Sequence, residues 1–204
     1  MPATSSCCPI AWRFGKLLAL LPVLALFGCA SQLPREAPVP GTEPALIKGF
    51  QLSGRIAVKY DGQGFSGGLR WQRSGESDDL LFLSPLGQGV AHVERDAHGV
   101  TLTAPDQPPY RAMDTAQLTQ QVLGWSLPLD GLRYWVLGVA APGSAATPEV
   151  DADKRLARLT QQGWRIDYLG YKRVDGTDLP GKIFLQRDEV EVKLVIDAWD
   201  AVSR

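Results

Sequence analysis

The sequence predicts a mainly β protein in which a twisted antiparallel sheet is curled and covered on its concave face by two short helices. Three observations support this fold class. Apolar and polar residues alternate over many short segments separated by turn residues. The spacing changes to that of helices once, in residues 114–138. Strand-like alternation then resumes, and this interruption disfavours a plain up-and-down closed barrel.

The first two strands are predicted over residues 50–60 and 65–72, joined by a turn at 61–64. Their apolar faces are formed by Leu52, Ile56, Val58 and Tyr60 in the first and by Phe65, Leu69 and Trp71 in the second. Gly67 and Gly68 lie inside the second strand, where they indicate either a bulge or bend or added room on the concave face.

Further strands are predicted over residues 80–83, 90–94 and 100–103. In the third strand we assign Leu81 and Leu83 to the interior, although Leu80 and Phe82 could face inward instead. The five segments from residue 50 to 103 and their turns form an antiparallel meander.

Two short helices follow. Asp114 or Thr115 can cap a helix that runs to Leu123 and stops at Gly124. A second helix is predicted from residue 130 to 137, before Gly138, with an apolar stripe of Leu132, Trp135 and Val136. After a loop at 142–144, strands are predicted over 156–160, 164–169, 182–187 and 190–196.

The first 28 residues have the pattern of a signal peptide. Arg13 and Lys16 precede a short apolar core over residues 17–26, which is shorter than the ~20 residues that span a bilayer. The segment ending in Cys29 resembles the bacterial lipobox, whose cysteine receives a diacylglyceryl group and becomes the new N-terminus. Residues 29–44, with four prolines, are predicted to be a lipidated start and a flexible tether. The alternative is an ordinary exported protein in which Cys29 is incidental.

Composition limits the remaining choices. Cleavage before Cys29 leaves 176 residues, which suits one domain over residues 45–204. That mature chain carries 19 Lys and Arg against 22 Asp and Glu, so no charge excess favours nucleic acid. Cys29 is its single cysteine, which excludes an intramolecular disulfide.

Catalytic and metal-binding patterns are missing from the sequence. His92 and His98 are the two histidines, and we find no set of ligands around them at metal-binding spacing. Neither a Gly-x-Ser-x-Gly elbow nor a phosphate-binding glycine loop is present. The sequence therefore predicts a protein that is not an enzyme and that holds neither a metal nor a cofactor beyond the lipid on Cys29.

Leu86 is the residue that points to a function. It lies in Ser84-Pro85-Leu86-Gly87, between two strands, where turns favour small or polar side chains. It either folds back onto the sheet edge or projects as a hydrophobic contact for a bilayer or a lipidated partner. Burial of one leucine contributes only ~1.5–3 kcal/mol, which suits a transient contact.

A resemblance to a known family covers nearly the whole chain. It is carried, in order, by Leu52-Ser53-Gly54-Arg55-Ile56-Ala57, Leu69-Arg70-Trp71-Gln72, Ser84-Pro85-Leu86-Gly87, Ser126-Leu127-Pro128-Leu129, Leu132-Arg133-Tyr134-Trp135-Val136-Leu137-Gly138 and Ile196-Asp197-Ala198-Trp199. With the lipobox, these segments resemble the LolB family, outer-membrane lipoproteins that receive other lipoproteins and insert them into that membrane.

The resemblance implies an incomplete, unclosed barrel of the LolA/LolB type, with a helical lid over an apolar cavity. It implies that Leu86 is the projecting residue needed for delivery to the membrane. Ala30 after the lipidated cysteine is consistent with a lipid-anchored protein on the periplasmic face of the outer membrane. The implied partners are a LolA-like periplasmic carrier, lipoprotein cargo and outer-membrane phospholipid, and we expect a monomer.

For the acyl-chain cavity we select sheet and lid residues from the predicted apolar faces. These are Leu52, Ile56, Val58, Leu69, Trp71, Leu81, Leu83, Leu132, Trp135 and Val136. Each could equally serve only as a core residue. The rival functions are a lipid-anchored structural or assembly protein with a packed core, a soluble periplasmic carrier of related fold, and a lipocalin-type binder of small hydrophobic ligands.

Overall fold

The computed structural model describes residues 47–203. The predicted signal peptide, Cys29 and the tether over residues 29–44 lie outside the described residues. Neither helix within the described range is long and apolar enough to cross a bilayer.

Eleven strands and two helices make up the described part of the chain. The strands are β1 (Gly49–Tyr60), β2 (Gln63–Ser74), β3 (Ser77–Leu83), β4 (Gly89–Asp96), β5 (Gly99–Thr103), β6 (Tyr110–Ala112), β7 (Ala146–Val150), β8 (Leu156–Gln161), β9 (Trp164–Val174), β10 (Thr177–Arg187) and β11 (Val190–Ser203). The helices are α1 (Thr115–Leu123) and α2 (Leu129–Trp135).

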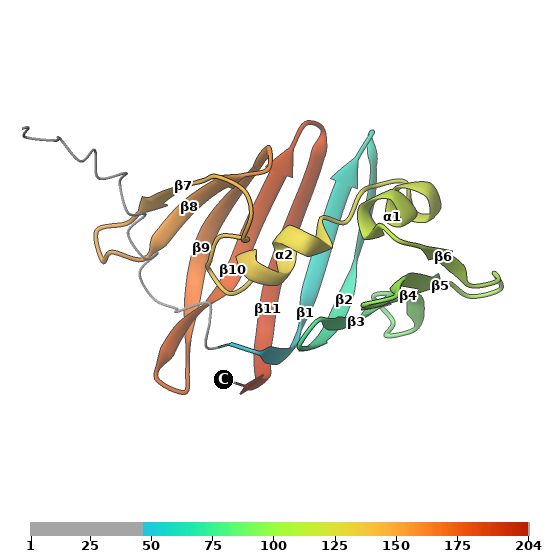
Figure 1. Cartoon of the computed structure of the whole chain (residues 1–204), viewed down its shortest axis with the longest axis horizontal. Helices are drawn as coiled ribbons and strands as arrows, with labels where there is room; N and C mark the ends of the chain where they lie inside the picture. The colour runs from blue at the N-terminus through green and yellow to red at the C-terminus, as the bar shows by residue number, and fades with distance from the viewer. Residues whose placement is uncertain (1–46, 204) are drawn as a thin grey trace, which may run out of the picture. The chain divides into compact units, whose positions relative to one another are not determined.

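All eleven strands form one antiparallel sheet in the order β6-β5-β4-β3-β2-β1-β11-β10-β9-β8-β7. The chain starts in the middle of the sheet, moves outward to β6, and then crosses to the opposite edge at β7 before returning to the middle. The sheet is unclosed because β6 and β7 do not pair. Residues 113–145 connect these two edges, and Figure 1 shows α1 and α2 lying on one side of the sheet along this crossing.

The predicted capping of the first helix is confirmed. The Asp114 carboxylate accepts a hydrogen bond from the backbone N–H of Gln117 at 2.6 Å, and Gly124 ends the helix with φ 83°. The second helix begins at Leu129 and ends at Trp135, so it starts one residue before the predicted range and stops two residues before its end.

The alternating segments are confirmed as strands, but two strands were not predicted. β6 has three residues, too few to show a period. In β7 four of five residues are exposed and Pro148 stands in its middle, so the strand has no apolar face. The last strands are also longer than predicted: the added residues of β9 and β10 pair with each other, and those of β11 pair with β1.

The start of β1 and the turn that carries Leu86 lie toward opposite ends of the strands. Lys48, which precedes β1, donates its backbone N–H to the carbonyl oxygen of Ser203, so the described chain starts beside its own C-terminal strand. The β3–β4 turn with Leu86 lies toward the other end, because Leu83 pairs with Gly68 and Gly68 pairs with Arg55, six residues into β1.

Two glycines mark places where neighbouring strands come very close. A Cβ atom on Gly54 would lie 2.3 Å from the carbonyl oxygen of Val195 in β11, at a register shift between β1 and β11. A Cβ on Gly67 would meet the carbonyl oxygen of Leu83 in β3. The pairing of β2 with β1 is regular through Gly67, so no bulge is observed there, and the collision shows a close approach of β3 where added room was the alternative.

We expect Gly54→Ala to lower the free energy of unfolding by about 1–3 kcal/mol, because the added methyl group collides with backbone that must shift. Gly170→Ala is the matched control, since its Cβ would meet only Lys182 Cβ at 3.9 Å. Urea unfolding should place the control within about 0.5 kcal/mol of the unmodified chain. Equal stability of the two variants would contradict the close approach.

Candidate functional site

Eight of the ten residues predicted to line a cavity lie between the sheet and its helical cover. None of the eight exposes more than 2% of its surface: Leu52, Ile56, Val58, Leu69, Trp71, Leu132, Trp135 and Val136. The five from β1 and β2 lie in one hydrophobic cluster with the three from α2 and the residues that follow it. The predicted apolar faces therefore meet as expected.

The assignment of Leu81 and Leu83 to the interior is wrong. Leu80 and Phe82 are the buried residues of β3, at 0% and 2% exposure, whereas Leu81 and Leu83 are half-buried on the opposite face. The β2–β3 register explains which residues of β3 face inward, because Trp71 pairs with Leu80 and Leu69 pairs with Phe82. Directly paired residues share a face of the sheet, so the inward Trp71 fixes Leu80 inward as well.

The C-terminal half of the sheet was not predicted to line the interior. β8 to β11 contribute a second set of buried apolar side chains to the same cluster: Leu159, Trp164, Ile166, Leu179, Ile183, Leu185, Leu194 and Ile196. The alternation in their strands was visible in the sequence and could have identified them. The interior is thus formed about equally by both halves of the sheet.

None of the eight buried residues that were predicted to line a cavity lines the hollows that follow. One of about 530 Å³ is lined by residues of β2 to β6, including Asp79 and Glu94, and one of about 660 Å³ surrounds the tip of the β1–β2 hairpin. A third, of about 20 Å³, lies beside Ile47. The eight predicted lining residues between sheet and helices are nearly inaccessible to solvent.

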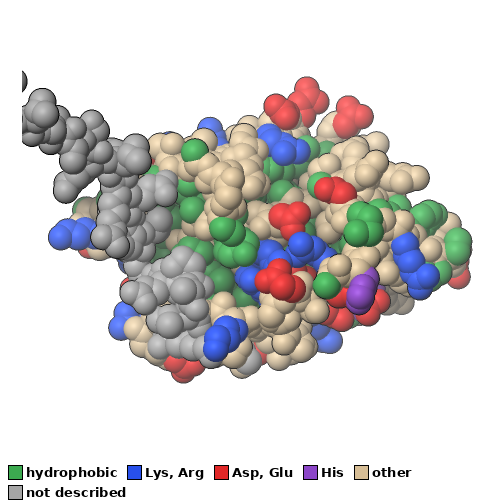
Figure 2. All heavy atoms as spheres, in the orientation of Figure 1, with side chains coloured by type: hydrophobic (Ala, Val, Ile, Leu, Met, Phe, Trp, Pro, Cys, Tyr) green, Lys and Arg blue, Asp and Glu red, His purple; other side chains and the backbone are tan. Residues whose placement is uncertain are grey.

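On one side, a buried group of charges joins α2 to β2, β3 and β4; we call it the Asp78 network. Arg133 of α2 places Nε 3.5 Å from the Asp78 carboxylate, and its Nη1 donates to Glu76 at 3.0 Å. Arg95 reaches both Asp78, at 3.4 Å, and Asp130 of α2, at 2.7 Å. In Figure 2, acidic and basic side chains lie side by side in the middle of this face, among hydrophobic ones.

The side chains of Trp71 and Arg73 also anchor this network to β2. Trp71 Nε1 donates to Asp78 at 3.1 Å, and Arg73 Nη1 donates to the backbone carbonyl of Arg133 at 3.1 Å. Burial raises the pKa of the Asp78 carboxyl, an effect that the neighbouring Arg133 opposes. Burial also lowers the pKa of Arg73, and the positive charge of Arg133 adds to this. Both pKa shifts arise mainly because these charged groups are held away from water.

On the other side, α2 is bound to β8 and β9 without ionised groups. Trp135 Nε1 donates to Gln161 Oε1 at 2.8 Å, and the Gln161 amide also bonds both backbone groups of Ala141. The Tyr168 hydroxyl donates to the carbonyl oxygen of Trp135 at 3.0 Å. α2 is therefore tied by polar contacts to both halves of the sheet.

Leu86 is separate from the interior. It is 88% exposed, the highest value among the large hydrophobic residues that the structure describes as exposed. The turn beneath it is closed by backbone bonds between Ser84 and both Gly87 and Gln88, and Gly87 takes φ 82°. Of the two predicted orientations, projection into solvent is the one observed.

Possible metal ligands also come together on the opposite face of the sheet. Asp79, His92 and Glu94 have ligand atoms within 4.8 Å of one another. This set was not predicted from the sequence, because Asp79 belongs to the neighbouring strand and only the β3–β4 register brings it beside His92.

Comparison with protein families gives one match that spans most of the described chain. The model of the family described as "Outer membrane lipoprotein LolB" matches residues 48–199. This range contains the interior residues of both halves of the sheet, the helical cover and the turn with Leu86.

Individual relatives agree with the family match. The chain is 40% identical to an outer-membrane lipoprotein LolB of Nitrosococcus oceani, over 89% of this chain and 95% of the relative. It is 41% identical to one of Thiobacillus denitrificans, over 87% of this chain and 92% of the relative. A solved structure of a LolA superfamily protein from Nitrosomonas europaea, 10% identical, covers 74% of this chain and 85% of its own with a TM-score of 0.46.

We expect Asp78→Asn to lower the free energy of unfolding by about 3–5 kcal/mol, because it removes the one buried carboxylate shared by Arg133 and Arg95 and leaves them only their exposed partners Glu76 and Asp130. Asp197→Asn is the control: it removes an exposed ion pair with Arg55 and should cost less than about 1 kcal/mol. Urea unfolding of both variants measures the difference. A loss in Asp78→Asn no greater than in the control would show that the network does not hold α2.

Proposed function

The chain belongs to the LolB family of outer-membrane lipoproteins, and from this premise we propose that it receives lipoproteins from a LolA-like carrier and inserts them into the outer membrane. The proposed receiving site is the apolar interior between the sheet and α1–α2. The observation that carries the proposal is this interior, which is lined by both halves of the sheet and closed by one short helical segment.

Acyl chains can enter this interior only if the helical segment moves. The helices have nine and seven residues, and helices of that length are not stable by themselves in water, so contacts with the sheet hold them in place. Displacing them exchanges side-chain contacts for contacts with the incoming chain. Burial of a sixteen-carbon chain is worth roughly 13 kcal/mol relative to water at ~0.8 kcal/mol per methylene, so the chain has to pass from the carrier to the interior without crossing water.

Transfer in this scheme runs downhill. The sequence has no phosphate-binding loop, so we assign no nucleotide hydrolysis to the chain. The interior has to bind acyl chains more tightly than the carrier does and less tightly than the bilayer does. A cover that must be displaced reduces the net affinity of the interior, which favours release into the membrane.

We assign release to Leu86 and attachment to Cys29. The exposed Leu86 side chain gains free energy when it enters a lipid phase, and its turn is short and fixed by hydrogen bonds. A lipid on Cys29 would keep the domain at the periplasmic face of the outer membrane, where the released cargo is inserted. We propose that the protein works as a monomer with phospholipid as its second partner.

A second candidate function is a lipid-anchored structural or assembly protein with a permanently packed core. The observation that favours it is the closed interior, since the predicted lining residues from β1, β2 and α2 are all nearly inaccessible. The two functions differ in one measurable respect, which is whether an acyl chain ever contacts the interior face.

A photo-crosslinking residue distinguishes them. With p-benzoylphenylalanine at Phe82, which faces the interior, we expect a crosslink to the acyl chains of lipoprotein delivered by its carrier. The same residue at Leu81, one position away on the opposite face, is the matched control and should give none. Crosslinks from neither position, or from Leu81 alone, would exclude the interior as the receiving site and favour the packed-core function.

We expect Leu86→Glu to accept cargo normally but to insert it into liposomes roughly 10–100-fold more slowly, because the ~1.5–3 kcal/mol from burying leucine is lost. Met113→Glu is the control, since Met113 is 81% exposed and lies before α1 instead of in this turn. Both steps are followed by separating liposome-bound from protein-bound cargo. Unchanged insertion by the Leu86 variant would refute its role.

A further inference from the structure

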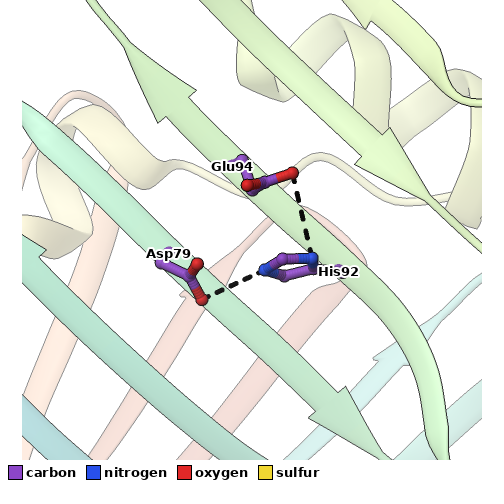
Figure 3. A group of neighbouring side chains, drawn as sticks. All are labelled: Asp79, His92 and Glu94. Atoms are coloured by element: carbon purple, nitrogen blue, oxygen red, sulfur yellow. Dashed lines mark ion pairs between the residues drawn. The ribbon is translucent and has the colours of Figure 1, made fainter.

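Three side chains with metal-ligating atoms lie together on the outer face of β3 and β4. His92 and Glu94 are two residues apart in β4, so they point to the same side of the sheet. Asp79 of β3 pairs directly with Glu94 in the register. Figure 3 shows the His92 ring between the two carboxylates, with Asp79 on one side and Glu94 on the other.

The distances place Asp79 and His92 close to a coordination geometry. His92 Nε2 lies 3.1 Å from Asp79 Oδ1. Two ligands with bonds of ~2.1 Å to one ion are separated by about 2.9–3.4 Å, so a single ion fits against both atoms. Glu94 lies 3.9 Å from the other ring nitrogen, and its exposed side chain is free to rotate toward the same ion.

The charges of the group are unbalanced. Two carboxylates directly opposite each other on neighbouring strands repel, which destabilises the pair. Among residues 47–203, the ion pairs of Asp79 and Glu94 all involve His92, and neither carboxylate pairs with a lysine or arginine. With a neutral imidazole the group carries two negative charges, which a divalent cation would neutralise.

We propose that Asp79, His92 and Glu94 form a binding site for a divalent first-row transition metal ion such as Zn²⁺. The donor set of one imidazole and two carboxylates favours zinc or its neighbours over Mg²⁺ and Ca²⁺, which prefer oxygen ligands alone. The ion completes its coordination with water, since Asp79 and Glu94 are exposed and line the rim of the 530 Å³ hollow.

The location of this site has a structural effect. The ion bonds β3 to β4, the two strands whose connecting turn carries Leu86. Leu81 and His92 form the next pair on the same face toward that turn, and Leu83 and Gly89 form the last pair before it. A bound ion therefore holds the base of this hairpin together from the face opposite the core.

The test is a calorimetric titration of the full, tag-free chain in detergent with ZnCl2. We expect one ion per chain to be held at this site, and His92→Gln and Asp79→Asn to weaken its binding about tenfold or more. His98→Gln is the matched control, because it removes the other histidine, in the β4–β5 turn, and should leave the affinity unchanged. All variants keep the three cysteines, so thiol binding contributes equally to each.

A second measurement on the unmodified chain avoids dependence on variant folding. Paramagnetic Co²⁺ should broaden the backbone amide resonances of Asp79, His92 and Glu94 before those of His98. The proposal is overturned if ZnCl2 does not bind, if His92→Gln binds as tightly as the unmodified chain, or if Co²⁺ broadens resonances only elsewhere.

Discussion

The outermost strands β6 and β7 lie at opposite ends of the strand order, and residues 113–145 must connect them. This connection passes over one face of the sheet, and in doing so it brings α1 and α2 against the apolar side chains of that face. The helical cover is thus a consequence of the topology. A sheet that closed into a barrel would need no such crossing and would have no element that could be displaced from its interior.

The polar contacts of α2 fix its position more than they stabilise the fold. A buried group of ions gains little net free energy, because the attraction between its members is offset by the cost of removing them from water. Breaking it by removing one member is nevertheless costly. The Asp78 network and the Gln161 contacts therefore define where α2 docks on the two halves of the sheet. The apolar contacts beneath it are of a kind that a hydrocarbon chain can replace.

The sequence was informative where a residue's environment depends on its near neighbours. Alternation identified the long strands, and Asp114 and Gly124 marked the ends of the first helix because capping is a local interaction. The orientation of β3 was not predictable, because Leu80 to Leu83 are all apolar and either phase buries two of them. Only the pairing with β2 determines which two face inward.

The buried Asp78, the Asp79–His92 contact and strand β7 could not be predicted, because each depends on contacts between residues distant in sequence. Asp78 has no sequence pattern that marks it as buried, since its partners Arg95 and Arg133 lie 17 and 55 residues away. The Asp79–His92 contact depends in the same way on strand register. β7 has too few apolar residues to show a period, and it exists because the backbone of β8 offers a free edge.

The placement of Leu86 relative to the start of β1 sets a requirement on the length of the preceding chain. Strand pairing puts the Leu86 turn about six residues along β1 from Gly49, or roughly 20 Å. The 18 residues from Ala30 to Ile47 extend to about 60 Å at most. That span is about three times the separation. If the domain is held at Cys29 as proposed, it is able to turn either end of its strands toward the bilayer, and a much shorter connection would permit only one orientation.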